Sequence, residues 1–290
     1  MQQPDVVSQP QGRRAGEQPP VARSVSVFIA AYNEVENLGP TVETVVRALE
    51  ETVGAYEIIV VNDGSTDGTR EVADRLASEN PRVLAIHNPG NKGLGYGWLR
   101  AVEVASQATF VFIPGDNTWP YSSLRDLFGS MGRADVITSY PTNSEIRVPA
   151  RRYLSVAYTT ALNLLFGLRL QYYHGLTIYP IEYLRSGVIT TYGFASMSEA
   201  LLRAIHRGYS YHAVPCAIEE RATGRSKAVS LHSLTSVIDT IGRLFLDLRL
   251  RSRRGPHSTL GLFGPARPHR RPANSTSAPS TGTPSTYGDA

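Results

Sequence analysis

The feature that most constrains the fold is an alternation of short apolar runs with longer stretches of helical periodicity. The apolar runs are rich in β-branched residues and span 24–30, 57–61, 82–87, 109–113 and 136–139. Between the first two runs, apolar residues recur at helical spacing from Leu38 to Leu49. Strands that alternate with helices build a parallel sheet covered on both faces. The sequence therefore predicts an α/β fold with a mostly parallel, Rossmann-like sheet and helices on both faces.

The pattern loosens after about residue 150. Helices are predicted at 151–167 and 196–208, and they bracket a short strand near 176–179; a further strand lies near 212–218. A last, C-terminal amphipathic helix is expected at 230–252. Its apolar stripe comprises Leu234, Val237, Ile238, Ile241, Leu244, Phe245 and Leu248. Two interpretations stay open: an interfacial helix with a basic collar on a membrane surface, or a helix packed on the domain core or on a second subunit.

Composition limits the remaining possibilities. Residues 1–22 and 253–290 are rich in Gln, Pro, Gly, Ser, Thr or Arg and are expected to be disordered tails, which leaves 23–229 as the main domain. No apolar run approaches the ~20 residues that span a bilayer. The single Cys216 excludes an internal disulfide. These features predict a cytoplasmic protein, peripheral at the cytoplasmic face of the membrane if the last helix binds lipid.

Arginines crowd the C-terminal part of a chain whose net charge is +4. Such a block can bind an anionic membrane surface or solvate a tail. No aromatic residues alternate with these arginines to stack on bases, so nucleic acid is not an expected partner.

Polar loops follow three of the predicted strands. Tyr32-Asn33-Glu34 follows the first, residues 62–69 the second, and Gly115-Asp116-Asn117 the fourth. Ligands of open α/β sheets bind outside the carboxyl ends of the strands, so these loops predict a ligand site. Taken singly, each loop has a simpler interpretation as a helix cap: Asn33 with Glu36 looks like a capping box, and Ser65 or Thr66 like an N-cap.

The phosphate-binding motifs of other α/β proteins are absent from the sequence. Gly93, Gly95 and Gly97 do not complete G-x-G-x-x-G, and no Gly-Lys-Ser/Thr motif occurs. A carboxylate such as Asp116 needs a cation between itself and a diphosphate, which predicts bound Mg²⁺ or Mn²⁺.

The loop residues form two extended motifs, Tyr32-Asn33-Glu34-x-Glu36-Asn37-Leu38 and Val61-Asn62-Asp63-Gly64-Ser65-Thr66-Asp67-Gly68-Thr69. Together they resemble the opening of the family-2 glycosyltransferases, which have the GT-A fold. Asn91-Lys92-Gly93-Leu94-Gly95 and Asp116-Asn117-Thr118-Trp119-Pro120 are similar to the dolichol-phosphate mannosyltransferase branch, the polyprenyl-phosphate sugar synthases. The resemblance covers about 24–228.

The resemblance implies roles for particular residues. Tyr32, Glu34 and Asp63 would contact the nucleoside, and Asp116 would hold the metal ion. Val61 and Gly115 would also belong to the residues that bind the nucleotide sugar. Arg221 and Lys227 would cover the donor and acceptor phosphates on a mobile loop around Gly224. Two cations six residues apart suit such a clamp on phosphate oxygens, although a solvated basic loop is the plainer interpretation.

The sequence departs from the family pattern at three places. Pro114 replaces the first aspartate of the metal motif, Thr118 replaces a glutamine, and Pro141 replaces an arginine after the fifth strand. Arg147, Arg151 or Arg152 could substitute for that arginine. The departures imply one of three outcomes: metal binding is weaker, it relies more on diphosphate oxygens, or arginines partly replace the metal.

The family likeness implies inverting transfer of a sugar from GDP-mannose or a UDP-sugar to polyprenyl (dolichyl) phosphate. A phosphate acceptor is a dianion near neutral pH and needs no general base, whereas a hydroxyl acceptor would need one, for which Glu199 is the candidate. Two alternatives remain: the same donor chemistry on a soluble hydroxyl compound, or a nucleotide-sugar-binding protein that has lost catalysis.

Overall fold

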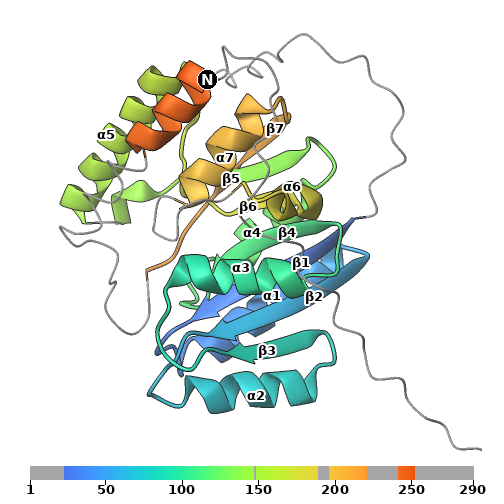
Figure 1. Ribbon diagram of the computed structural model, residues 1–290. Helices are drawn as coiled ribbons and strands as arrows, with labels where there is room; N and C mark the ends of the chain where they lie inside the picture. The colour runs from blue at the N-terminus through green and yellow to red at the C-terminus, as the bar shows by residue number, and fades with distance from the viewer. Residues whose placement is uncertain (1–22, 147, 189–195, 221–240, 252–290) are drawn as a thin grey trace, which may run out of the picture. The chain divides into compact units, whose positions relative to one another are not determined.

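A seven-stranded sheet forms the centre of the computed structural model, which describes residues 23–146, 148–188, 196–220 and 241–251 (Figure 1). The strand order is β3-β2-β1-β4-β6-β5-β7, and only β6 runs antiparallel to its neighbours. The strands are β1 (Ser24–Ala31), β2 (Ala55–Asn62), β3 (Val83–His87), β4 (Thr109–Pro114), β5 (Val136–Pro141), β6 (Thr177–Pro180) and β7 (Tyr211–Cys216). The predicted mostly parallel sheet is confirmed.

Helices cover both faces of the sheet. They are α1 (Leu38–Thr52), α2 (Thr69–Glu79), α3 (Leu94–Val104), α4 (Tyr121–Gly129), α5 (Pro149–Phe166), α6 (Ile181–Arg185) and α7 (Ser196–His206), with short helical turns η1 (Ser144–Ile146) and η2 (Leu246–Arg251). Helices α1, α2 and α4 share one apolar cluster with alternate residues of β1, such as Val27. Helices α3, α5, α6 and α7 share the other cluster with Phe28. Strand β1 is therefore apolar almost throughout, because both of its faces are buried.

The predicted strands and helices match the structure to within one to three residues at most ends, but two helices were not predicted. Helix α4 follows Pro120 and buries Leu124, Leu127 and Phe128 at helical spacing against the sheet. The five-residue helix α6 directly follows β6. Both are short, and α4 occupies a stretch that the sequence analysis left as a connection.

Cys216 lies in the core at the end of β7, as expected for a lone cysteine. Its thiol donates to the carbonyl oxygen of Ser123 on α4 at 3.6 Å. Burial raises the pKa of this thiol to about 12, so it stays protonated at neutral pH.

The predicted C-terminal helix is described only from Ile241 onward; residues 230–240 lie outside the described residues. Leu244 is buried, and Ile241, Phe245 and Leu248 pack against the same cluster as α5 and α7. The rings of Phe245 and Phe166 meet edge to face with centroids 6.2 Å apart. In its described part, this stripe therefore packs on the domain core, the second of the two interpretations.

No described helix combines the length and apolar character that a membrane-spanning segment needs.

Replacing Gly175 with alanine is expected to destabilise the fold strongly. A Cβ at this position would lie 1.8 Å from the carbonyl oxygen of Ser139, so β5 and the segment leading into β6 would have to separate. We expect a loss of about 2–4 kcal/mol in the free energy of unfolding, measured by chemical denaturation. Gly39→Ala is the matched control: a Cβ there meets nothing within 4 Å, and alanine favours helix α1, so this variant should be as stable as the wild type or slightly more stable.

Candidate active site

Three loops begin at one edge of the sheet, where parallel strands β1, β2 and β4 end. The strands are in register, so that Ala31 lies opposite Asn62, and Ala30 opposite Pro114. The backbone N–H of Asp63 donates to the carbonyl of Ala31, and that of Gly115 donates to Ala30, each at 2.9 Å. Because β1 lies between β2 and β4, the chain reverses its direction of winding here, which is the place where such sheets bind ligands.

The loops after β1 and β2 are joined by four hydrogen bonds. The N–H of Asn33 donates to the hydroxyl of Ser65 at 2.9 Å, and the side chain of Asn33 accepts from Thr66 N–H at 3.0 Å. Glu34 N–H donates to the Thr69 hydroxyl at 2.8 Å. A fourth bond runs from Val35 N–H to the Asp67 carboxylate at 3.2 Å. Tyr32 and Glu34 therefore lie on a rim that bonds within the protein itself hold together.

These bonds overturn the helix-cap interpretation of the two loops. Helix α1 begins at Leu38 with Asn37 as its N-cap, and α2 begins at Thr69 with Gly68 as its N-cap. Asn33 adopts a left-handed backbone conformation, φ 56°, and turns its side chain toward the second loop instead of pairing with Glu36. The capping pattern was local, whereas the partners that Asn33 finds are more than 30 residues away.

The carboxylate of Asp67 helps to fasten the same rim. Burial alone would raise its pKa, but the hydroxyl and N–H of Thr69 and the N–H of Val35 all donate to it, so the pKa is lowered. The negative charge of Asp67 is therefore kept at neutral pH, together with the bonds that it accepts.

Asp63 is almost fully buried at the start of the loop after β2, and its side chain holds a further loop, residues 88–93. Its carboxylate accepts from the Asn88 amide at 2.8 Å and from the N–H groups of Lys92 and Gly93 at 2.9 and 2.8 Å. A carboxylate has about four acceptor positions, so about one remains for a ligand. Asp63 is thus both a support for the 88–93 loop and a candidate contact for a nucleoside.

Close backbone packing keeps these two loops together. A Cβ on Gly64, whose φ is +71°, would lie 2.5 Å from the backbone of Gly90.

Two further predicted residues have partners within the protein. Val61, predicted to bind the nucleotide sugar, turns its side chain into the apolar cluster under α3, so only its backbone lies near the loop edge. Glu34 accepts from the Asn37 amide at 2.8 Å, and its carbonyl accepts from the first residues of α1.

Asp116 is the single acidic residue of the loop after β4. Its carboxylate accepts a hydrogen bond from the Thr118 hydroxyl at 2.8 Å, and Asn117 between them has a left-handed backbone, φ 53°. Among the residues that the structure describes, no three His, Cys, Asp or Glu side chains gather into a metal-binding group. A Mg²⁺ ion often takes only one or two carboxylates and completes its shell with phosphate oxygens and water, so Asp116 alone still fits such an ion when a diphosphate is bound.

Glu199, the candidate general base, lies in the first turn of α7 and has no exposed surface. Its carboxylate accepts from the Arg203 guanidinium at 2.9 Å, and Arg203 also donates to Asp247 of η2 at 3.2 Å. The described structure therefore places Glu199 in a buried ion pair that joins α7 to the C-terminal segment. Arg221 and Lys227, the predicted phosphate clamp, lie outside the described residues.

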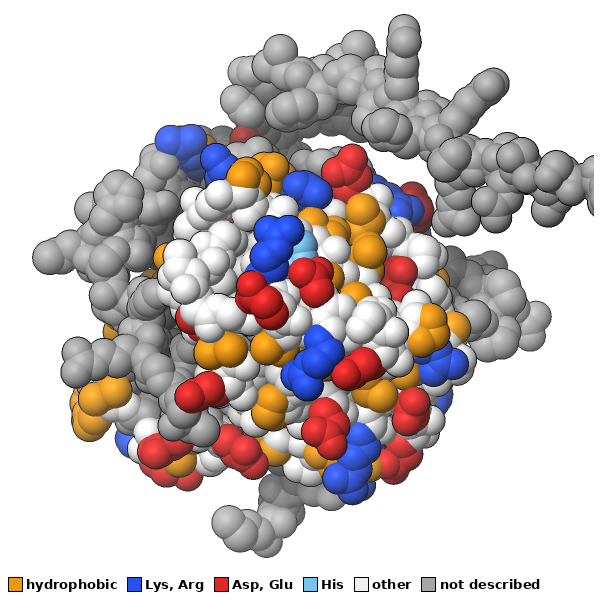
Figure 2. All heavy atoms as spheres, turned by 90° about the horizontal axis from the view of Figure 1, so that it is seen from below, with side chains coloured by type: hydrophobic (Ala, Val, Ile, Leu, Met, Phe, Trp, Pro, Cys, Tyr) orange, Lys and Arg blue, Asp and Glu red, His pale blue; other side chains and the backbone are white. Residues whose placement is uncertain are grey.

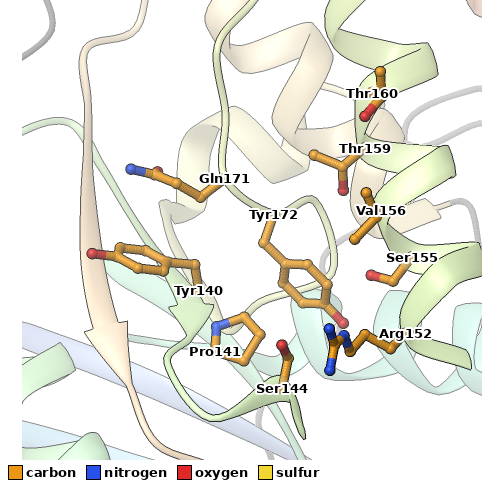
Figure 3. Close-up of a pocket in the computed structure, with 10 residues that line it drawn as sticks. All are labelled: Tyr140, Pro141, Ser144, Arg152, Ser155, Val156, Thr159, Thr160, Gln171 and Tyr172. Atoms are coloured by element: carbon orange, nitrogen blue, oxygen red, sulfur yellow. The ribbon is translucent and has the colours of Figure 1, made fainter. Parts of the chain in front are cut away.

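A pocket of about 220 Å³ opens beside the carboxyl end of β5 (Figure 3). Tyr140 and Pro141 come from β5, Ser144 from η1, Gln171 and Tyr172 from the segment before β6, and Arg152, Ser155, Val156, Thr159 and Thr160 from α5. In Figure 3, Arg152 and Tyr172 point toward one another, with Ser144 and Ser155 beside them. No sequence pattern predicted this pocket; of its lining residues, only Arg152 was a candidate, as a substitute for the arginine that Pro141 replaces.

The comparison with protein-family models identifies the chain. Residues 26–187 match the model of glycosyl transferase family 2, which is more than half of the sequence. The chain belongs to glycosyltransferase family 2. The resemblance seen in the loop motifs is confirmed, and so is glycosyltransferase activity as the class of function.

Three curated relatives have names that describe sugar transfer or the synthesis of a lipid-linked sugar phosphate. Polyprenol monophosphomannose synthase from Mycolicibacterium smegmatis is 30% identical over 232 residues, which cover 73% of this chain and 85% of the relative. Undecaprenyl-phosphate mannosyltransferase from Micrococcus luteus is 26% identical over 214 residues, 70% of this chain and 86% of the relative. Glycosyltransferase AglD from Haloferax volcanii is 35% identical over 123 residues, but the matched part spans only 20% of that protein.

Solved structures share the fold. Glucosyl-3-phosphoglycerate synthase from Mycobacterium tuberculosis, in complex with Mn²⁺, UDP-glucose and phosphoglyceric acid, superposes with a TM-score of 0.58 at 20% identity. The superposition covers 78% of this chain and 79% of that one. It confirms the GT-A type of α/β architecture.

Asp63→Asn is expected to destabilise the loops at the site. The substitution places an amide NH₂ against donors that the carboxylate now satisfies, and the position is nearly buried. We expect a loss of about 2–4 kcal/mol in unfolding free energy, together with faster hydrogen exchange at Lys92 and Gly93. Asp135→Asn is the control, because Asp135 also accepts from a backbone N–H, that of Ser210, but in solvent; its loss should stay below about 1.5 kcal/mol. Equal losses in the two variants would contradict the supporting role of Asp63.

Proposed function

We propose that this glycosyltransferase moves a sugar from a nucleotide-diphosphate sugar, GDP-mannose or a UDP-sugar, to the phosphate of a polyprenyl (dolichyl) phosphate. The observation that carries the acceptor is the pocket at the end of β5. It combines one guanidinium, that of Arg152, with several hydroxyl groups, and these are ligands for phosphate oxygens.

The position of the pocket suits an acceptor. Strand β6 runs antiparallel between β4 and β5, so β4 and β5 point the same way and end at the same edge of the sheet. The pocket residues Tyr140 and Pro141 therefore lie at the edge that also carries Asp116. A donor on the loops after β1, β2 and β4 and an acceptor beside β5 would approach each other along this edge.

The proposed step is a single displacement. A phosphate oxygen of the acceptor attacks the anomeric carbon, the bond from that carbon to the donor's diphosphate breaks, and the nucleoside diphosphate leaves with the electron pair. The product is a sugar joined to the lipid phosphate with inverted configuration. Since a phosphate monoester has its second pKa near ~6, the acceptor is largely a dianion at neutral pH and loses no proton in the step.

The ion pair of Glu199 agrees with a reaction that needs no general base. A carboxylate that is buried against Arg203 would have to leave its partner to take a proton, and breaking such a pair costs several kcal/mol. We therefore assign Glu199 to the support of α7 and η2 when the acceptor is a phosphate.

The leaving diphosphate needs positive charge. A Mg²⁺ or Mn²⁺ ion bound by Asp116 and the diphosphate oxygens would neutralise that charge as it develops. Asp116 would hold the ion, and the Thr118 hydroxyl would orient the carboxylate. Arg221 and Lys227 are proposed as further cations over the phosphates.

The relatives support the acceptor more than the donor. Two of them are named for mannose transfer to polyprenol or undecaprenyl phosphate, whereas the structural neighbour was solved with UDP-glucose. Both donors are therefore kept in the proposal, and the assay below separates them.

Transfer should appear as label in the lipid phase when purified protein receives radiolabelled GDP-mannose or a UDP-sugar, a polyprenyl phosphate and Mn²⁺. We expect Arg152→Gln to raise the KM for the lipid phosphate about ten- to a hundred-fold, because a charge-assisted contact is lost, with little change in the KM for the donor. Asp116→Ala should abolish the dependence of the rate on Mn²⁺.

Arg125→Gln serves as the control for Arg152, since Arg125 lies on α4, on the opposite face of the sheet from α5, and pairs with Asp126 in solvent. If the label enters only a soluble acceptor, the acceptor is a hydroxyl compound and not a lipid phosphate. No transfer to any acceptor, with nucleotide binding intact, would favour a protein that has lost catalysis.

We further propose that α5 rests on the membrane that holds the acceptor, at its cytoplasmic face. Tyr153, Val156 and Leu164 lie on one side of this helix and are 70%, 60% and 78% exposed. Leu162 and Phe166, on the opposite side, are buried in the core. A helix with an apolar outer side as well as an apolar inner side is typical of binding at a membrane interface, and Figure 1 shows α5 at the margin of the domain.

The double variant Tyr153→Glu/Leu164→Glu should bind vesicles at least ten-fold more weakly than the wild type, because two exposed apolar groups outside the pocket would no longer enter the lipid. Co-sedimentation with anionic vesicles that contain polyprenyl phosphate measures this. Val104→Glu changes an exposed apolar residue on α3 and should bind as the wild type does. Unchanged binding of the double variant would remove α5 from the proposed membrane contact.

A further inference from the structure

His87 ends strand β3 and lies at the base of the second loop. Its Nδ1 atom is 3.2 Å from the Nδ2 of Asn62, and its Nε2 atom is 2.8 Å from a carboxylate oxygen of Asp74 on α2. Asn62 in turn accepts from the backbone N–H of Ser65 through its Oδ1 at 3.1 Å. A chain of hydrogen bonds therefore runs from α2 through His87 and Asn62 to the loop that carries Asp63.

The donor and the acceptor of each hydrogen bond in this series follow from the bond at Ser65. The Oδ1 of Asn62 receives the Ser65 N–H, so the amide turns its NH₂ group toward His87. Nδ1 of His87 must then be an acceptor, and the ring proton sits on Nε2, where it is donated to Asp74. The chain is complete only when the imidazole is neutral.

A second proton on His87 would break the chain at Asn62. Nδ1–H would face the NH₂ group of Asn62, donor against donor. If the amide turned over to accept this proton, its NH₂ group would face the N–H of Ser65 instead. Asn62 is nearly fully buried and cannot replace the lost bond with water at low cost. The first arrangement sets two donors against each other beside the amide that holds Ser65, and the second removes the acceptor of Ser65.

Ser65 matters because its hydroxyl accepts from Asn33 N–H and so joins the first loop to the second. Asn62 also bonds to the 88–93 loop, since its carbonyl accepts from the N–H of Asn88, whose side chain donates to Asp63. Through these bonds His87 is linked to the loops after β1 and β2 and to the 88–93 loop.

We infer that His87 is a positioning residue for the nucleotide-binding loops, and that protonation of its ring loosens the 62–69 loop and weakens nucleotide binding. The inference about nucleotide binding rests on the proposed function, because it takes these loops as the donor site. The loosening of the loop itself does not depend on any ligand.

The charged groups around His87 permit such a proton switch. Strand β2 presents Asn62, and α2 presents Asp74, which also pairs with Arg70 at 3.9 Å. The nearby carboxylate of Asp63 accepts a hydrogen bond from the side chain of Asn88, the residue that follows His87. The His87 side chain is 15% exposed, so protons can reach it from solvent. Figure 2 views the α2 side of the molecule, where acidic and basic side chains lie interspersed on the surface.

Two substitutions separate the two ends of the ring. His87→Asn places a carbonyl oxygen near the position of Nδ1, where it can accept from Asn62 at every pH. His87→Gln reaches the position of Nε2 and can donate to Asp74, but it offers nothing to Asn62. Histidine changes charge between pH 5 and 8, whereas neither amide does.

The experiment measures hydrogen exchange of the Ser65 amide in the protein without ligand, at pH 8 and pH 5.5, corrected for the intrinsic exchange rate. In the wild type, protection should fall roughly five-fold at pH 5.5, the equivalent of one ordinary hydrogen bond. His87→Asn should keep high protection at both pH values, and His87→Gln should show low protection at both. Equal protection of the wild type at the two pH values, or an unchanged pH response in His87→Asn, would overturn the inference.

Asp74→Asn provides a measurement that survives if a His87 variant does not fold. Asp74 lies 2.8 Å from the ring and would attract its positive charge, so neutralising Asp74 should move the midpoint of the Ser65 transition to lower pH. A midpoint that stays in place, or moves to higher pH, would count against His87 as the titrating group.

The link to function is tested by the dissociation constants of GDP and UDP at the same two pH values. We expect weakening of roughly five-fold at pH 5.5 in the wild type beyond any change in His87→Asn, which also corrects for protonation of the nucleotide near pH ~6. If neither nucleotide binds while Ser65 behaves as expected, the proposed function fails and the positioning role of His87 stands. If a nucleotide binds tightly while Ser65 does not respond to pH, the function stands and the role of His87 fails.

Discussion

The pairing of β1 with a parallel neighbour on each side is the interaction on which the rest of the structure depends. Strands β2 and β4 hydrogen-bond to its two edges, and helices cover both of its faces. The bonding continues one residue beyond the strands, where the N–H groups of Asp63 and Gly115 donate to Ala31 and Ala30. The loops of the proposed donor site therefore start from a buried part of the fold, and their first residues have little freedom.

The parts of the fold predicted from sequence are those with a strong local signal. Continuous apolar runs located the first five strands to within two residues at most ends, because a strand buried on both faces has no polar side. Helix α4 has the helical spacing of Leu124, Leu127 and Phe128, yet it is only nine residues long and was overlooked. The predicted helix caps were wrong for a different reason. The side chain of Asn33 bonds to Thr66, and no local sequence pattern indicates a partner so far along the chain.

The candidate site divides in the same way. Asp63 and Asp116 could be named as candidates because motif and position after a strand agree, and the structure places both at the predicted edge of the sheet. The partners of Asp63, which are the Asn88 side chain and two backbone N–H groups, could not be found, since any residue supplies an N–H. The pocket gathers side chains from four separate segments, so no spacing in the sequence marks it. Glu199 has the residue type of a base, but only its burial against Arg203 shows how its charge is used.

The proposed donor site and the proposed acceptor site are built from different kinds of groups. The loops of the proposed donor site are bonded to one another by groups of the protein itself, which limits the ordering that binding of a nucleotide would require. The acceptor pocket is instead lined by hydroxyls and one guanidinium on α5, beside an exposed apolar surface. Proline at position 114 removes one negative charge from between these two regions. A diphosphate and a phosphate dianion must approach each other there, and with Asp116 as the only acidic residue of its loop the cations have less negative charge of the protein to neutralise. A weaker metal site is therefore compatible with the chemistry, provided that arginines such as Arg152 supply the remaining positive charge.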